Sequence, residues 1–302
     1  MIQLTNVQKK FGQRLAVDDL SFAVERGEIF GLLGHNGAGK STAIGMMLGQ
    51  VWPTAGEVKI CGYDVAVNRS AALQKVGAIF ETPVFYDYLS GWRNLQILST
   101  YTAPTSAARI QEVVEWVGLT GREHSKVRTY SHGMRSRLAL AQALLPKPEL
   151  LILDEPSDGL DPEGIHEMRQ TILRLQRELR LTIFLSSHLL NEVEQLCTRI
   201  AILQRGKKVF EGTVAGVTSA QGRVALKTPD FARAASLLTE RGLITATLED
   251  RYITLAKEHS TADITQALVT AGIAVEGIWQ HEQTVEDFYL SLVKPPPVIN
   301  GN

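Results

Sequence analysis

Residues 34–41 read Gly34-His35-Asn36-Gly37-Ala38-Gly39-Lys40-Ser41, which matches the pattern G-x-x-x-x-G-K-[ST]. A short apolar run, residues 29–33, precedes the pattern, and the residues from Lys40 to about Leu48 have the character of a helix. Glycines in such a loop let backbone N–H groups turn toward phosphate oxygens, and the helix N-terminus adds positive potential. The stretch therefore predicts a phosphate-binding loop, with a Gly-rich turn and an exposed lysine as the alternative. We expect a phosphate-containing ligand to contact Gly34, His35, Asn36, Gly37, Ala38, Gly39, Lys40, Ser41 and Thr42.

Two side chains of the loop and two acids further along the chain carry the predicted chemistry. Lys40 can reach the β- and γ-phosphates of a nucleotide, and the Ser41 hydroxyl can bind Mg²⁺. A second apolar run, residues 150–153, ends in Asp154 and Glu155. Ligands of open α/β sheets lie at the carboxyl ends of strands. We therefore expect Asp154 to hold Mg²⁺ and Glu155, which points elsewhere, to deprotonate an attacking water. An acidic helix cap is the alternative for the two acids.

The composition limits the class of protein. The 302 residues are 44% hydrophobic and 21% charged, with a formal net charge of -1, which is typical of a folded chain of about two domains. The chain lacks the excess of basic residues that would indicate a nucleic-acid partner. Cys61 and Cys197 form no metal-ligand or disulfide pattern, so we expect thiols in a reducing cytosol. The N-terminus lacks the pattern of a signal peptide, and glycine and proline interrupt the longest uncharged stretch, so we expect no membrane insertion by this chain.

The hydrophobic patterns predict an α/β fold in two parts. Residues 1–25 read as β and predict an N-terminal antiparallel part of a mixed sheet. Residues 83–148 are mostly helical and predict an inserted helical subdomain. Near residue 214 the order becomes strand, helix, strand, strand, helix, strand, which predicts a small α+β domain of ferredoxin-like βαββαβ type. We expect domains at residues 1–213 and 214–294 and a flexible tail at 295–302.

In this order the motifs resemble the nucleotide-binding subunit of ABC transporters, a P-loop NTPase family, over about residues 1–213. Ser131-His132-Gly133-Met134-Arg135 resembles the LSGGQ signature of the family. The match departs from the family at Tyr130, which stands for Leu, and at His132, which stands for the first Gly. The resemblance implies that Ser131 and Gly133 contact nucleotide phosphate, with an ordinary Ser-capped helix as the alternative.

Three more residues take their expected roles from the same resemblance. Asp161 is similar to the aspartate of the D-loop. His188, which follows the predicted strand at residues 183–185, is similar to the switch histidine that hydrogen-bonds the γ-phosphate. Phe11 occupies the place of the aromatic residue that stacks on adenine. A structural histidine and a core phenylalanine are the alternatives for the last two.

One further departure concerns the subfamily. The family normally has Gln where this chain has Glu81, directly after Ala78-Ile79-Phe80. A glutamate here resembles the ATPases of lantibiotic and bacitracin exporters. It would still bind Mg²⁺ while adding negative charge near the γ-phosphate. With the C-terminal extension, this resemblance implies an exporter of antibiotic, peptide or other hydrophobic compounds.

The resemblance also implies an assembly. ATP and Mg²⁺ would be the cofactors, and ATP hydrolysis would be coupled to transport. A homodimer, or a heterodimer with a related ATPase, would pair the phosphate loop of one subunit with Ser131 and Gly133 of the other. A separate transmembrane permease would hold the dimer at the inner face of the cell membrane. Candidates for the permease contact, with core packing as the alternative, are Tyr86, Tyr88, Leu89 and Trp92. An importer ATPase and a soluble non-transport ABC ATPase stay open as alternative functions.

Overall fold

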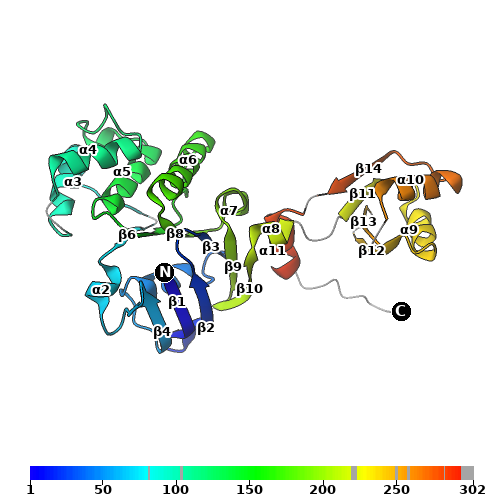
Figure 1. Cartoon of the computed structure of the whole chain (residues 1–302), viewed down its shortest axis with the longest axis horizontal. Helices are drawn as coiled ribbons and strands as arrows, with labels where there is room; N and C mark the ends of the chain where they lie inside the picture. The colour runs from blue at the N-terminus through cyan, green and yellow to red at the C-terminus, as the bar shows by residue number, and fades with distance from the viewer. Residues whose placement is uncertain are drawn as a thin grey trace. The chain divides into compact units, whose positions relative to one another are not determined.

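Figure 1 shows the computed structural model, which describes residues 1–80, 82–102, 105–218, 223–248, 251–256, 259–281 and 283–293. The chain divides into two units, Met1–Thr213 and Val214–Asn302, and each is considered by itself. Two expectations from the sequence, the metal contact of Glu81 and the tail at 295–302, lie outside the described residues.

The central sheet of the first unit has the strand order β10-β9-β3-β8-β7-β6. All neighbours are parallel except β10, which is antiparallel to β9. In that order the strands span Lys207–Thr213, Arg199–Gln204, Ile29–Leu33, Thr182–Ser187, Leu150–Asp154 and Val76–Ile79. The three strands β3, β7 and β8 are buried along their whole length, because both faces of the sheet are covered.

The register of these strands sets the position of the loops that follow them. Leu33 at the end of β3 pairs with Ser187 at the end of β8, and Asp154 at the end of β7 pairs with Ser186. Parallel strands present their carboxyl ends at one edge of the sheet. The phosphate-loop sequence, the two acids and His188 therefore leave the sheet side by side.

The N-terminal antiparallel strands that the sequence predicted form a sheet of their own, separate from the central mixed sheet. Its order is β2-β1-β4-β5, spanning Arg14–Val24, Ile2–Phe11, Ala55–Ile60 and Tyr63–Asp64. One apolar core joins it to the central sheet. Helix α1 (Lys40–Met47), which follows the phosphate loop, contributes side chains to this core. Phe22 of β2, Phe30 of β3 and Phe184 of β8 stack with ring centroids 5.2–6.0 Å apart. This stack fixes the antiparallel sheet against the strands that carry the site.

Helices cover the sheet, and those of the predicted helical subdomain gather in one region of the first unit (Figure 1). They are α3 (Gly91–Ser99), α4 (Ala107–Trp116) and α5 (His132–Leu144), with a 3₁₀ turn at Val127–Thr129. Ser90, Ser106 and Ser131 each accept a hydrogen bond from a backbone N–H of the first turn, which sets where these helices begin. The remaining helices of this unit are α2 (Arg69–Leu73), α6 (Pro162–Leu179) and α7 (Leu190–Leu196).

The second unit has the predicted ferredoxin-like topology. Its antiparallel sheet has the order β12-β13-β11-β14, spanning Ile244–Leu248, Tyr252–Leu255, Arg223–Lys227 and Gly277–His281. Two helices, α9 (Phe231–Glu240) and α10 (Thr261–Thr270), complete the split βαβ pattern and share an apolar core with the sheet. The unit begins and ends with helices α8 (Val214–Thr218) and α11 (Val285–Val293), which pack together. The sequence did not predict α8.

Within the described part of the chain, no helix combines the length and the apolar character needed to cross a bilayer.

We predict that Phe30→Ala destabilises the first unit by about 3–5 kcal/mol, because a fully buried ring leaves the stack and a cavity remains. Phe11→Ala is the matched control, since Phe11 is 50% exposed. Its effect should stay within about 0.5 kcal/mol. Urea unfolding of both variants measures the difference, and equal losses would contradict the role of the stack.

Candidate nucleotide site

The phosphate loop runs from the end of β3 to the start of α1 and takes a shape that requires glycine. Gly39 has φ 111°, and a Cβ there would lie 2.7 Å from the Ala16 carbonyl oxygen. A Cβ on Gly34 would lie 2.7 Å from the Leu203 carbonyl oxygen. Among the described residues no side chain caps the first turn of α1, so its N–H groups keep their hydrogen-bonding capacity. A helix start of this kind favours an anion.

Lys40 is held inside the loop rather than in solvent. It is 5% exposed, and its Nζ donates to the Gly34 carbonyl oxygen at 2.6 Å. The same Nζ lies 3.0 Å from Oε1 of Glu155. The loop closes around its own lysine, which excludes the alternative of an exposed lysine on a turn.

The two acids at the end of β7 have different partners. Asp154, 5% exposed, accepts a hydrogen bond from the Ser186 hydroxyl at 2.6 Å. Glu155 has φ 50°, in the left-handed region, and its N–H donates to Oγ of Ser186 at 3.0 Å. This backbone conformation directs the Glu155 carboxylate toward Lys40, whereas the Asp154 carboxylate faces β8.

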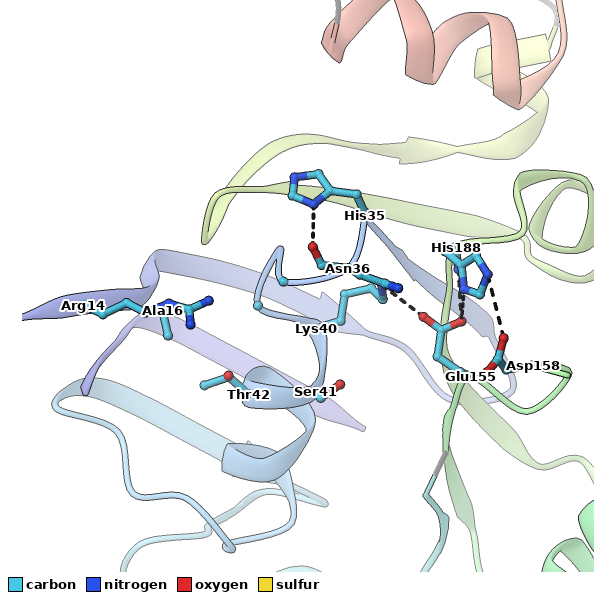
Figure 2. Close-up of a pocket in the computed structure, with 12 residues that line it drawn as sticks. Arg14, Ala16, His35, Asn36, Lys40, Ser41, Thr42, Glu155, Asp158 and His188 are labelled. Carbon is cyan, nitrogen blue, oxygen red and sulfur yellow. Dashed lines mark hydrogen bonds and ion pairs between the residues drawn. The ribbon is translucent and has the colours of Figure 1, made fainter. Parts of the chain in front are cut away.

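His188 completes a group of three at this edge of the sheet. Its Nδ1 lies 2.8 Å from Oε2 of Glu155, and its backbone N–H donates to the same oxygen at 3.1 Å. Its Nε2 lies 3.9 Å from Oδ1 of Asp158. Figure 2 shows the side chains of Lys40, Glu155 and His188 converging on one space. One carboxylate thus contacts both the lysine and the histidine.

These residues line a cavity of about 330 Å³. The lining residues that the sequence predicted are His35, Asn36, Gly37, Gly39, Lys40, Ser41, Thr42, Glu155 and His188. The lining also contains Arg14, Ala16 and Asp158, which the sequence analysis missed. Arg14 and Ala16 come from the start of β2, and no local pattern marks them. Asp158 follows the predicted site residues Asp154 and Glu155 by only a few positions, so its place in the sequence could have indicated that it lines the cavity.

Three residues that the sequence predicted as nucleotide contacts, Gly34, Ala38 and Phe11, do not line this cavity. Ala38 is fully buried and supports the loop from behind. Phe11 pairs with the cavity residue Arg14 across the β1–β2 turn, and its ring is 50% exposed with the Nζ of Lys9 4.9 Å from its centroid. Phe11 is therefore on the surface and not in the core.

The signature-like segment lies at a second cavity. Ser131, Gly133 and Asp161 line it, together with residues of α5 and α6. Ser131 caps α5 by accepting from Met134 N, and Asp161 caps α6 by accepting from Gly164 N at 2.8 Å. These three residues do not line the cavity at the phosphate loop of the same chain.

Both departures from the signature pattern have a structural role. Tyr130 is buried, and its hydroxyl donates to the Arg122 carbonyl oxygen at 2.8 Å. Burial raises the pKa of the Tyr130 hydroxyl. The Nε2 atom of His132 lies 3.1 Å from the carbonyl oxygen of Asp158, so the start of α5 contacts the segment that follows Glu155.

The chain is similar in sequence and in structure to known proteins. Residues 17–158 match the family model described as ABC transporter. The chain is 42% identical over 293 residues to the uncharacterized ABC transporter ATP-binding protein YhcH of Bacillus subtilis (strain 168), covering 97% of this chain and 95% of YhcH. It is 36% identical over 296 residues to the bacitracin transport ATP-binding protein BcrA of Enterococcus faecalis, covering 97% and 96%. A solved structure of the ATP-binding subunit of an ABC transporter is similar at 29% identity and a TM-score of 0.63, covering 72% of this chain and 92% of that chain.

We predict that Lys40→Met lowers the free energy of unfolding of the first unit by about 3 kcal/mol, because it leaves the Glu155 carboxylate without its buried partner. The double variant Lys40→Met/Glu155→Gln should lose less than the sum of the two single losses. Lys59→Met is the control, since it breaks the partly exposed pair with Glu57 and should cost at most about 1 kcal/mol. Urea unfolding tests the cycle, and strict additivity would show that the pair does not couple.

Proposed function

This chain belongs to the ABC transporter ATP-binding protein family and is an ATPase; from that premise we propose that it powers the export of an antibiotic, a peptide or another hydrophobic compound. The similarity to BcrA, a protein named for bacitracin transport, supports this substrate class, and it extends over 97% of the chain, so it includes the second unit. Glu81, in the place where most of the family has Gln, is the sequence feature that supports export.

The observation that carries the catalytic proposal is the contact of Glu155 with both Lys40 and His188 at the cavity. Lys40 forms an ion pair with Glu155 in this arrangement. The phosphates of ATP offer Lys40 other anionic partners, and Glu155 is then free to take a proton from the attacking water. His188 orients the carboxylate through Nδ1, and its Nε2 is then available to the γ-phosphate.

The oxygen donors near the loop fit Mg²⁺. Ser41 offers a hydroxyl at the cavity and Asp154 a carboxylate at the end of β7, and Mg²⁺ prefers one or two protein oxygens together with substrate phosphates. Among the described residues, no group of three or more His, Cys, Asp or Glu side chains could hold a metal ion. When bound, the ion would polarise the phosphates. Glu81, which lies outside the described residues, is a further proposed ligand.

The separation of the two cavities supports a dimer as the active form. Ser131 and Gly133 lie at one cavity and Lys40 at the other, so a site that uses both needs a second subunit. A homodimer, or a heterodimer with a related ATPase, would bring the α5 N-terminus of one chain to the loop of its partner. Phe11, exposed beside the cavity, would stack on the adenine.

A surface of the helical region is the proposed contact with the permease, which would hold the dimer at the inner face of the cell membrane. Tyr86 and Tyr88 are 41% and 67% exposed and pack edge to face at 6.1 Å. Leu89 and Trp92 are half-buried, and the Trp92 ring lies 5.5 Å from that of His124. The two tyrosines are therefore the stronger candidates.

Glu155→Gln tests the catalytic proposal. Loss of the base should lower ATP turnover by at least about 100-fold, while ATP still binds and still drives dimerisation. Glu178→Gln, an exposed position on α6, is the control and should keep wild-type turnover. Steady-state hydrolysis and size-exclusion chromatography with ATP give the two readouts. Undiminished hydrolysis by Glu155→Gln would exclude Glu155 as the base.

Export is tested in a sensitive bacterial host that expresses the chain with the permease of the neighbouring reading frame. We expect the pair to raise the inhibitory concentration of at least one compound in a panel that begins with bacitracin. The Glu155→Gln pair should give no protection. A pair that instead makes the host more sensitive, or that drives accumulation of the compound inside the cells, would favour uptake over export.

A further inference from the structure

Glu192 of α7 is a buried acid that the proposed chemistry does not use. It is 3% exposed. One carboxylate oxygen accepts a hydrogen bond from the Ser157 hydroxyl, and the other accepts from the Ser187 hydroxyl at 3.1 Å. Both serines are 1% exposed. The carboxylate therefore has two buried partners, one in the loop after β7 and one at the end of β8.

The two serines belong to the segments that carry Glu155 and His188. Ser157 follows Glu155 by two residues, and Ser187 directly precedes His188. The Ser187 hydroxyl also accepts the N–H of Leu189 at 3.0 Å, which fixes the turn at the end of β8. One side chain on α7 thus joins both segments behind the contact between Glu155 and His188.

We propose that Glu192 is a positioning residue for ATP hydrolysis, which holds the Glu155 and His188 segments at the separation that their 2.8 Å contact requires. The inference rests on the proposed roles of these two residues. A displacement of about 1 Å at a reacting group lowers rates by about 100-fold. A tie between the supporting segments therefore acts on turnover, whereas nucleotide affinity depends mainly on the phosphate loop.

Stability alone does not account for a carboxylate at this position. Burial raises the pKa of Glu192, and the negative charge of Glu155 raises it further, while the two serine hydroxyls and the positive charge of Arg169 lower it. A buried carboxylate costs free energy that a hydrophobic side chain of similar size does not. The compensating gain that the geometry offers is a fixed connection between the loop after β7 and the end of β8.

The test measures kcat, the KM for ATP and thermal unfolding for Glu192→Ala and Glu192→Gln. We expect Glu192→Ala to lower kcat by about 10- to 100-fold while KM changes by less than about 2-fold. Glu192→Gln should recover part of the rate, because its carbonyl oxygen accepts from one serine and its amide donates to the other. Glu194→Gln, which removes a charge from the same helix, is the control and should keep the wild-type kcat.

Serine variants keep the inference testable if Glu192→Ala fails to fold. Ser157→Ala/Ser187→Ala removes both contacts and should reproduce the loss of kcat, and adding Glu192→Ala should then lower it little further. Wild-type kcat in a folded Ser157→Ala/Ser187→Ala variant would overturn the positioning role. Equal effects of Glu192→Ala and Glu192→Gln on kcat and on KM would also overturn it.

The parallel measurement of Glu155→Gln separates this inference from the proposed function. If Glu155→Gln keeps full turnover, the catalytic assignment fails. If Glu155→Gln is inactive while Glu192→Ala is folded and fully active, the positioning role of Glu192 alone fails.

Discussion

The buried ion pair between Lys40 and Glu155 is the interaction on which the arrangement of the site depends. Both side chains are nearly inaccessible, and isolated charges in such a place would be strongly unfavourable. The pair is satisfied because Lys40 also donates to Gly34 and Glu155 also accepts from the backbone of His188. Those contacts require β3, β7 and β8 to be neighbours, so the strand order of the sheet and the electrostatics of the site depend on each other.

Local sequence patterns predicted the individual segments of the site. The packing of segments that are far apart in sequence determines where they lie. The loop at residues 34–41 and the acids after β7 are contiguous in sequence, and strand ends in parallel sheets share one edge, so their proximity was predictable. Arg14 and Ala16 reach the cavity through the β1–β2 hairpin, whose placement depends on packing between two sheets. Glu192 was missed for a related reason: a glutamate in a short polar helix has the pattern of a solvated residue, and its burial follows only from where α7 lies.

The fold prediction succeeded where periodicity was strong. The ferredoxin-like order of the second unit follows from alternating strand and helix patterns, and the observed strand order agrees. The helix α8 was missed because Val214–Thr218 is short and contains glycine and β-branched residues, which lower helix propensity. The alternative reading of Phe11 as a core residue was wrong, because a ring at a hairpin end has no layer above it to bury it.

The two residues that depart from the signature pattern each form specific contacts within the chain. Tyr130 fills space near Gly91, where a Cβ would lie 2.4 Å from its hydroxyl oxygen, and His132 contacts Asp158. Both contacts remain within the chain, so the changed residues connect the start of α5 to its own surroundings and leave Ser131 and Gly133 facing the second cavity.

The left-handed backbone of Glu155 and its buried ion pair have opposite effects on stability at one position. A residue with a Cβ chain costs about 1–2 kcal/mol in this conformation, and glycine or asparagine adopts it more easily. Glycine at this position would relieve the backbone strain but would leave the buried Lys40 ammonium without its partner, at a larger cost. The ion pair therefore keeps the proposed base on a backbone conformation that other residue types adopt more easily.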